Sequence, residues 1–270
     1  MARGRIISVA NQKGGVGKTT TAINLGACLA DLGRKVLLLD LDPQANTTSG
    51  LAASLNGGQS LKNIYQALTG ECSLQETVQE AKPAGLRLIV SAPELAGAEI
   101  ELLDLPRREY RLQEAMGGLA LEYDYVIIDC PPALSILTLN ALTACDRVLI
   151  PLQCEYYALE GLGRLLKTLS LVRERLNSGL KMEGIVLTMF DPRNNLSRQV
   201  REEVVKHFGD KVFRAVIPRN VRLGEAPSHG LPIILYDLHC AGAKAYMALA
   251  DELLVRDGLA VSTGARPDEP

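Results

Sequence analysis

The sequence predicts an α/β protein with a mostly parallel, twisted sheet and helices on both of its faces. Short apolar runs alternate along the chain with segments at helical spacing, which is the pattern of successive βαβ units. Hydrophobic residues make up 47% of the 270 residues, so we expect one large domain over residues 1–261. The polar, proline-containing residues 262–270 are expected to be a disordered tail.

The expected strands are short apolar runs rich in β-branched residues. They cover residues 6–10, 36–40, 86–90, 125–129, 148–151, 184–188 and 212–217. Apolar residues at helical spacing predict helices over residues 19–32, 61–68, 107–119, 159–176, 197–208 and 241–255. The segment from residue 52 to residue 83 gives the weakest pattern of either kind.

A glycine-rich loop separates the first expected strand from the first expected helix. It reads Lys13, Gly14, Gly15, Val16, Gly17, Lys18, Thr19, Thr20. Glycines let the backbone turn its N–H groups around phosphate oxygens, and the helix that follows directs its positive end at them. Lys18 would neutralise phosphate charge, and the Thr19 hydroxyl would hold Mg²⁺. The order of strand, loop and helix predicts a P-loop rather than a flexible turn.

One position departs from the usual P-loop spacing. The motif expects glycine at position 12, where this chain has Gln12, and a second lysine follows as Lys13. This is the deviant form of the motif. The extra lysine suggests a second role besides phosphate binding.

Two strand ends supply carboxylates beside the loop. Asp129 ends an apolar run, so it would lie at the carboxyl edge of the sheet and hold Mg²⁺ directly or through water. Asp40 ends another run, and Asp42 follows two residues later. We expect Asp40 near the Mg²⁺ shell and Asp42 orienting the attacking water. The alternatives are that Asp129 only faces solvent and that Asp42 with Pro43 only makes a turn.

Charge and cysteine usage narrow the class of protein. The net charge is −2, but residues 193–222 carry +5, which leaves −7 for the rest, so a local basic patch can form on an acidic protein. The six cysteines are scattered, which argues against a metal site and favours a reducing compartment. No apolar run approaches the roughly 18 residues of a membrane span, so a cytoplasmic protein is expected.

Several segments together resemble one family. They are KGGVGKTT, DLDPQANTTSG, YDYVIIDCPP, PLQCEYYALEG, LTMFDPRNN and IPRNVRLGEAPSHG. These segments look like those of the ParA/Soj ATPases, the partition members of the deviant P-loop group that also holds MinD, over nearly the whole chain. The resemblance implies a P-loop NTPase-like fold, ATP or ADP with Mg²⁺ as ligands, and hydrolysis of ATP to ADP and phosphate.

The resemblance also implies roles for individual residues. ATP would bring two subunits face to face, with Lys13 reaching the partner's phosphates and Asp42 orienting the water. Thr19 and Asp129 match the Mg²⁺ contacts. The residues expected to contact nucleotide are Lys13, Gly14, Gly15, Val16, Gly17, Lys18, Thr19, Thr20, Asp40, Pro43, Met189, Pro218 and Asn220.

The implied partners follow from the same resemblance. Arg193 and Arg222 match the family's DNA-contacting arginines, and solvated surface charge is the alternative for each. One patch would bind DNA weakly, on the order of 10⁻⁴ to 10⁻⁶ M, whereas two patches in an ATP dimer would act together. The expected partners are a second copy of the chain, non-specific double-stranded DNA and a ParB/Spo0J-like centromere-binding protein, in a nucleoid-associated setting without a membrane.

Two other functions share the loop. A MinD-like positioning ATPase would act on a membrane or a protein array without DNA, but such relatives end in an amphipathic helix and this tail is polar. A dethiobiotin- or cobyrinate-type enzyme would pass the γ-phosphate to a small carboxylate or amide, and the sequence offers no constellation for that substrate.

Overall fold

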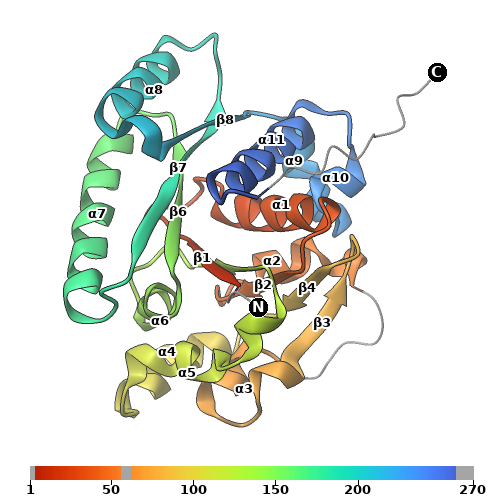
Figure 1. Ribbon diagram of the computed structural model, residues 1–270, viewed down its shortest axis with the longest axis vertical. Coiled ribbons are helices and arrows are strands. Elements are labelled where there is room, and N and C mark those ends of the chain that lie inside the picture. The colour runs from red at the N-terminus through yellow and green to blue at the C-terminus, as the bar shows by residue number, and fades with distance from the viewer. Residues whose placement is uncertain (1–3, 56–61, 260–270) are drawn as a thin grey trace.

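The computed structural model describes residues 4–55 and 62–259 and forms a layered α/β fold (Figure 1). Its eight-stranded sheet has the order β3-β4-β2-β5-β1-β6-β7-β8. Neighbouring strands pair in parallel, except that β3 runs antiparallel to β4 at one edge. The predicted fold class, a mostly parallel sheet in an α/β protein, is confirmed.

The elements follow one another in alternation along most of the chain. The strands are β1 (Arg5–Val9), β2 (Val36–Asp40), β3 (Val78–Ala81), β4 (Leu86–Ile89), β5 (Tyr125–Asp129), β6 (Arg147–Gln153), β7 (Lys181–Phe190) and β8 (Val212–Pro218). The helices are α1 (Lys18–Asp31), α2 (Asn46–Gly50), α3 (Ile64–Thr69), α4 (Leu95–Glu101), α5 (Arg111–Met116), α6 (Ile136–Ala144), α7 (Ala158–Arg175), α8 (Asn195–Phe208), α9 (Val221–Glu225), α10 (Ile233–Tyr236) and α11 (Ala241–Arg256).

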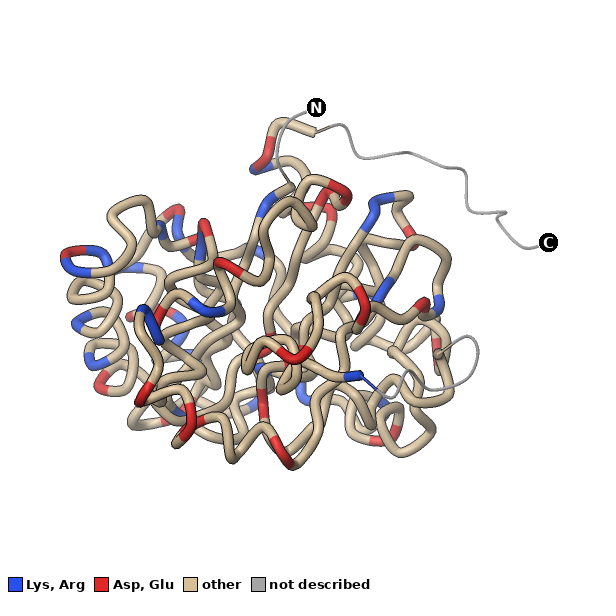
Figure 2. Tube along the Cα trace, turned by 90° about the horizontal axis from the view of Figure 1, so that it is seen from below, with Lys and Arg blue, Asp and Glu red and all other residues tan. Residues whose placement is uncertain are grey.

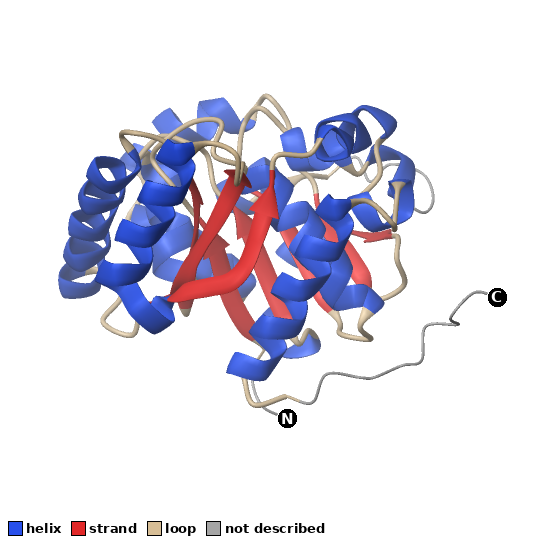
Figure 3. Cartoon of the chain, turned by 90° about the horizontal axis from the view of Figure 1, so that it is seen from above, coloured by secondary structure: helices blue, strands red, loops and turns tan. Residues whose placement is uncertain are grey.

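Helices cover both faces of the sheet (Figure 3). One hydrophobic core joins the sheet to α1, α9, α10 and α11, and the other joins it to α3 through α8. Successive side chains of a strand point to opposite faces, so Leu37 and Leu39 of β2 enter one core and Leu38 enters the other. Burial on both faces fixes the central strands, and with them the positions of the residues that follow their carboxyl ends.

Some helices were not predicted, and α6 shows why. Its residues are buried on nearly every side, so its sequence has no polar face and no amphipathic period that a pattern could detect. The predicted helix over residues 107–119 is wrong as one element. It is split into two 3₁₀ turns, Arg108–Tyr110 and Leu119–Glu122, with the short α5 between them. Gly117, at φ +42°, ends α5.

The segment with the weak pattern forms an edge of the sheet. Asn63 caps α3 by accepting a hydrogen bond from the Tyr65 N–H at 2.9 Å, and Gly70, at φ +91°, ends the helix. The strand β3 was not predicted. Residue 61, where the predicted helix began, and the predicted tail lie outside the described residues, so the domain boundary at residue 261 stays a prediction. Within residues 4–55 and 62–259, no helix has the length and apolar character needed to cross a membrane.

Candidate functional site

The glycine-rich loop connects β1 to α1 at the carboxyl edge of the sheet. Gly15 and Gly17 have φ values of +73° and +86°, a left-handed backbone that glycine adopts without the penalty of a Cβ atom. Gly17 stands directly before α1, and its carbonyl accepts the first helical hydrogen bond, from the Thr21 N–H. The free N–H groups of the first turn of α1 can therefore bind an anion.

Two side chains fix the loop, one at its own start and one from β7. The Asn11 amide donates to the Pro151 carbonyl at 2.8 Å, and its Oδ1 accepts from the Lys13 N–H at 3.0 Å. The Thr188 hydroxyl of β7 donates to the Val16 carbonyl at 2.9 Å. Both ends of the loop are thus tied to the sheet, and its shape is set without a ligand.

The two lysines of the loop have different surroundings. Lys18 is 7% exposed, and its Nζ donates to the Lys13 carbonyl at 3.0 Å across the loop. Burial lowers the pKa of Lys18, although the nearby Asp129 opposes this effect. The Lys13 side chain is 41% exposed and forms an ion pair with Glu155, just before α7. Lys18 therefore lies in the loop, whereas Lys13 lies at its rim.

The three predicted carboxylates come together at the ends of β2 and β5. Asp40 and Asp129 are register partners in these parallel strands, and both side chains are fully buried. Burial raises the pKa of each, and the negative charges of the neighbouring carboxylates raise it further. Asp42 is 6% exposed and contributes to this repulsion. The alternative of a solvent-facing Asp129 is wrong.

Hydroxyl and backbone N–H groups satisfy three of the four oxygens of Asp40 and Asp129. Asp40 Oδ2 accepts hydrogen bonds from the Thr48 N–H at 2.8 Å and from its hydroxyl at 2.7 Å. Asp129 Oδ2 accepts from the Thr47 hydroxyl at 2.8 Å, and Asp129 Oδ1 is buried without a hydrogen-bond partner. The nearby Thr19 hydroxyl lowers the pKa of Asp129. An unpartnered buried carboxylate oxygen beside a threonine hydroxyl fits a hard cation such as Mg²⁺.

Asp42 makes a turn and also lies near the loop lysine. Its Oδ1 accepts from the Gln44 N–H at 3.0 Å, and its carbonyl accepts from the Ser91 hydroxyl at 2.7 Å. Pro43 lies in this turn, so the alternative of a turn at Asp42 and Pro43 describes the backbone correctly. The negative charge of Asp42 also raises the pKa of Lys18. The turn therefore holds a carboxylate beside the loop.

The three residues predicted to meet adenine line one cavity. Met189, Pro218 and Asn220 surround about 200 Å³ of space together with Gly17 and Thr20 of the loop. Met189 has a φ of +49°, a left-handed backbone that is uncommon outside glycine and that occurs at ligand sites. The strands β7 and β8 thus bring distant residues beside the first turn of α1.

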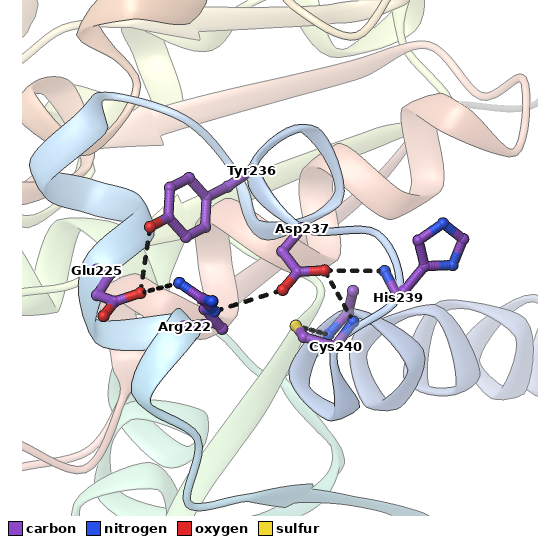
Figure 4. A network of polar contacts seen from close by, with 7 residues as sticks. Arg222, Glu225, Tyr236, Asp237, His239 and Cys240 are labelled. Atoms are coloured by element: carbon purple, nitrogen blue, oxygen red, sulfur yellow. Dashed lines mark hydrogen bonds and ion pairs between the residues drawn. The ribbon is translucent and has the colours of Figure 1, made fainter.

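The two predicted DNA-contacting arginines are exposed and paired with carboxylates. Arg193 forms a two-point contact with Asp191, at 3.0 Å from Nε and 2.9 Å from Nη2. Arg222, on α9, donates to Glu225 at 2.9 Å, and its Nε lies 3.5 Å from Asp237 (Figure 4). Because both guanidinium groups are exposed, each can bind an external anion. That anion must compete with the carboxylates that already pair with the guanidinium.

The basic segment does not form one patch. The seven residues of β8 span about 20 Å, so Lys211 and Arg214 lie at the opposite end of the strand from Arg219 and Arg222. Basic and acidic positions are interspersed along the chain (Figure 2). The basic residues of 193–222 are therefore divided between the two ends of β8, because the segment crosses the height of the sheet. Arg193 and Arg222 follow the carboxyl ends of β7 and β8, at the edge that also bears the loop.

Other residues of the site were missed. They are Asn11, Thr47, Thr48, Ser91, Glu155 and Thr188, which fix the loop, hold the carboxylates or pair with Lys13. The adjacent threonines after the second strand could have been noticed, because hydroxyls near a buried carboxylate are its usual donors. Glu155 gives no comparable signal, since its contact with Lys13 depends on how β1 and β6 pair.

The geometry of the loop and the carboxylates defines a class of protein. A phosphate-binding loop between β1 and α1, with carboxylates at the ends of two neighbouring parallel strands, is the site of a P-loop nucleotide-binding protein. A family model described as an AAA domain matches residues 4–182.

Two curated relatives narrow that class. The chain is 55% identical over 254 residues to the chromosome partitioning protein ParA of Myxococcus xanthus, covering 94% of this chain and 89% of that protein. It is 54% identical over 250 residues to the sporulation initiation inhibitor protein Soj of Bacillus subtilis, covering 93% and 98%. The chain belongs to the ParA/Soj family of chromosome-partitioning ATPases.

A solved structure shares both sequence and fold. It is the cobyrinic acid a,c-diamide synthase of Mycobacterium smegmatis with a bound ATP analogue and magnesium. That chain is 38% identical, with a TM-score of 0.80, over 94% of this chain and 96% of its own length. The likeness confirms the P-loop NTPase-like fold.

Proposed function

We propose that this protein is a DNA-segregation ATPase that forms a sandwich dimer when it binds ATP. The dimer binds double-stranded DNA non-specifically, and a ParB-like centromere-binding partner stimulates hydrolysis and release, which makes the protein nucleoid-associated. The observation that carries this proposal is the contrast between the two lysines. Lys18 is buried in its own loop, whereas Lys13 is exposed at the rim, where a second subunit can meet it. The partitioning role named for its relatives supports the same function.

The loop and the carboxylates have separate roles in this proposal. The backbone of Gly14, Gly15, Val16, Gly17 and Thr20 surrounds the phosphates, and Lys18 neutralises their charge. Thr19 and Asp129 would hold Mg²⁺, which when bound screens the charge of the terminal phosphates. Asp42 accepts a hydrogen bond from the attacking water and orients it. Asp40 holds the loop after β2 in place through Thr48, and Pro43 fixes the turn beside the phosphates.

The cavity beside the loop is assigned to the adenine base. Met189, Pro218 and Asn220 line it, and it adjoins Gly17 and Thr20, where the phosphates are expected. Its volume of about 200 Å³ suits a single planar base. The apolar lining and the Asn220 amide offer stacking and hydrogen bonding to that base.

The surface around Lys13 has the composition of an interface. Tyr157 lines a shallow cavity together with Lys13, and it is 64% exposed. The neighbouring Tyr156 is 76% exposed, and the two rings pack edge to face at 5.0 Å. Exposed aromatic side chains beside a charged rim are typical of protein interfaces. They support a second copy of the chain as the partner that Lys13 meets.

The test is DNA binding with ATP and with ADP over a range of salt concentrations. The Asp42→Ala variant should hold ATP without hydrolysing it, so it should remain dimeric and bind duplex DNA more tightly as salt falls. The Asp210→Ala variant, in which an exposed carboxylate is removed, is the matched control and should hydrolyse ATP as the unchanged protein does. No salt-sensitive binding by ATP-loaded Asp42→Ala would contradict the proposal.

One observation favours a second candidate, an enzyme that transfers phosphate to a small molecule. The solved relative at 38% identity is named as an amide-forming synthase. Product analysis separates the two functions, because a segregation ATPase passes phosphate only to water. Flotation with liposomes in the presence of ATP tests the remaining alternative, a MinD-like positioning ATPase, which would bind the vesicles and leave DNA unbound.

A further inference from the structure

Arg222 is exposed, yet its guanidinium lies between two carboxylates of its own chain (Figure 4). Its Nη1 donates to Glu225 Oε2 at 2.9 Å, one turn along α9, and its Nε lies 3.5 Å from Asp237 Oδ2, just after α10. The contact with Glu225, and after it the nearby Tyr236 hydroxyl, raises the pKa of Arg222, and Arg222 in turn lowers the pKa of Glu225. The guanidinium therefore has partners on two sides before any external anion arrives.

Neighbouring groups hold both carboxylates in place. The Tyr236 hydroxyl donates to the same Glu225 oxygen at 3.1 Å, and its ring stacks on His229 at 4.9 Å. Asp237 Oδ1 accepts from the N–H groups of His239 at 3.2 Å and Cys240 at 3.1 Å, directly before α11. Because separate elements fix the two carboxylates, they stay beside Arg222 when its side chain moves.

We propose that Glu225 and Asp237 form a carboxylate clamp that competes with DNA phosphate for Arg222. Two negative charges surround one positive charge. A DNA phosphate must therefore take the place of the carboxylates at the guanidinium, and it is then repelled by both of them because they remain nearby. The proposal rests on the DNA-binding function proposed above. The clamp weakens DNA binding by the arginine-bearing surface of each subunit, so that DNA is held only when an ATP dimer presents two such surfaces together. Glu225 and Asp237 are thus positioning residues that suppress DNA binding by the monomer.

Arg193 provides an internal comparison. Its guanidinium meets one carboxylate, Asp191, in a two-point contact at the start of the loop before α8. Arg219 also acts on Asp191, so two arginines and one carboxylate give a positive local charge there, whereas one arginine and two carboxylates give a negative charge around Arg222. The clamp should therefore limit DNA binding more strongly at Arg222.

The test uses the Glu225→Gln and Asp237→Asn variants of the full chain. Each amide keeps an oxygen that can accept the hydrogen bond from Tyr236, His239 or Cys240, so the fold should be retained. Exposed ion pairs are weak, so each change should tighten binding of a short duplex DNA by roughly two- to five-fold at low salt. The gain should shrink as salt rises, because the charges lie at the surface.

A double-mutant cycle separates the clamp from general repulsion of DNA. In the Arg222→Gln background, Glu225→Gln should give little or no further gain, because the competition it relieves is absent. The same gain in both backgrounds would overturn the clamp. Glu114→Gln, which removes a surface carboxylate that pairs with two arginines on the other side of the sheet, is the matched control and should leave DNA affinity unchanged.

The outcomes also distinguish the clamp from the function on which it rests. ATP-dependent DNA binding by the unchanged protein, with no tightening in either clamp variant, would overturn the clamp and leave the proposed function intact. No DNA binding by the unchanged protein or by the variants would overturn both. Tightening that is larger without ATP than with it would support suppression of the monomer.

Discussion

The carboxylates at the ends of β2 and β5 and the arginines after β7 and β8 differ in how far neighbouring groups compensate their charges. At the ends of β2 and β5, Asp40 and Asp129 are fully buried, and one oxygen of Asp129 has no hydrogen-bond partner. At the surface after β7 and β8, Arg193 and Arg222 are exposed, and both are paired with carboxylates. The first region has three buried carboxylates beside one buried lysine, Lys18, so its negative charge is only partly compensated, whereas the charge of the second region is already compensated.

This difference explains two kinds of binding. Buried like charges are costly without a partner, so the first region gains much from a cation and a nucleotide that complete it. Exposed pairs gain little from exchanging a carboxylate for a phosphate, so under the proposed function the second region would bind DNA weakly and would depend on several contacts at once. We therefore expect large effects from changes at the first region and small, salt-dependent effects at the second.

Loss of Lys18 should have the largest effect. Lys18→Ala removes a buried cation that would contact the phosphates, and truncating one partner of a buried charge contact costs about 2–5 kcal/mol of binding free energy, which corresponds to at least about thirty-fold weaker ATP binding. Titration calorimetry with ATP and Mg²⁺ measures this. Lys35→Ala, at an exposed lysine just before β2, is the control. Unchanged ATP affinity in Lys18→Ala would contradict the claim that changes in the buried region have the largest effects.

The stability of the free protein should depend on pH through Asp40 and Asp129. Because burial raises both pKa values, the protonated forms stabilise the fold at low pH, and this stabilisation is lost as pH rises through the raised values. Asp129→Asn should therefore stabilise the free protein near pH 8 by on the order of 1–3 kcal/mol, and less near pH 5. Thermal unfolding at the two pH values measures it.

Asp210→Asn, at an exposed carboxylate, should not change the unfolding midpoint at either pH. If Asp129→Asn were destabilising to the same extent at both pH values, then Asp129 would not carry unfavourable charge in the free protein.

Reversal of charge at Arg222 should have an intermediate effect. Arg222→Glu replaces an attractive group by a repulsive one beside Glu225 and Asp237, so DNA affinity at low salt should fall by about ten-fold or more in the ATP dimer. Fluorescence anisotropy with labelled duplex measures it. Arg173→Glu, with the same charge change in the last turn of α7, should have a much smaller effect. Equal losses in the two variants would mean that only net charge matters.

Removal of the ion pair between Arg193 and Asp191 should have the smallest effect on DNA affinity. Asp191→Asn removes the one carboxylate that holds this guanidinium, so DNA affinity should rise by roughly two-fold and the rise should disappear at high salt. The same anisotropy assay detects it. A gain larger than that of Glu225→Gln would reverse the ranking of the two arginines.

Much of the fold followed from local pattern. The buried strands β1, β2 and β5 read as short apolar runs, and the order of strand, glycine loop and helix located α1 to within a residue. The sequence could not predict α6, because it is buried on nearly every side and has no amphipathic period, or β3, which is a short edge strand with half-buried positions. Short helices such as α9 and α10 have too few turns for a period to emerge.

The parts of the site that lie within one short segment of sequence could be predicted. The loop and the carboxylates at strand ends could be named, because parallel strands present their carboxyl ends at one edge. Their pairing could not be predicted, since the register of Asp40 with Asp129 depends on the order of the strands. The partners of Lys13 and Arg222 were missed for the same reason. Glu155 precedes α7 and Asp237 follows α10, and only the assembled fold brings Glu155 to Lys13 and Asp237 to Arg222, whereas Glu225 lies three residues from Arg222 on the same helix.

The central claim is that Lys13 serves a second subunit, and the oligomeric state with ATP tests it most directly. Static light scattering of Lys13→Ala with ATP and Mg²⁺ should give the mass of a monomer, whereas the unchanged protein and the Lys35→Ala variant, at an exposed lysine outside the surface around Lys13, should give that of a dimer. Calorimetry on the same Lys13→Ala sample should still detect ATP binding, because Lys18 remains in its loop. An ATP-dependent dimer of Lys13→Ala would contradict the account.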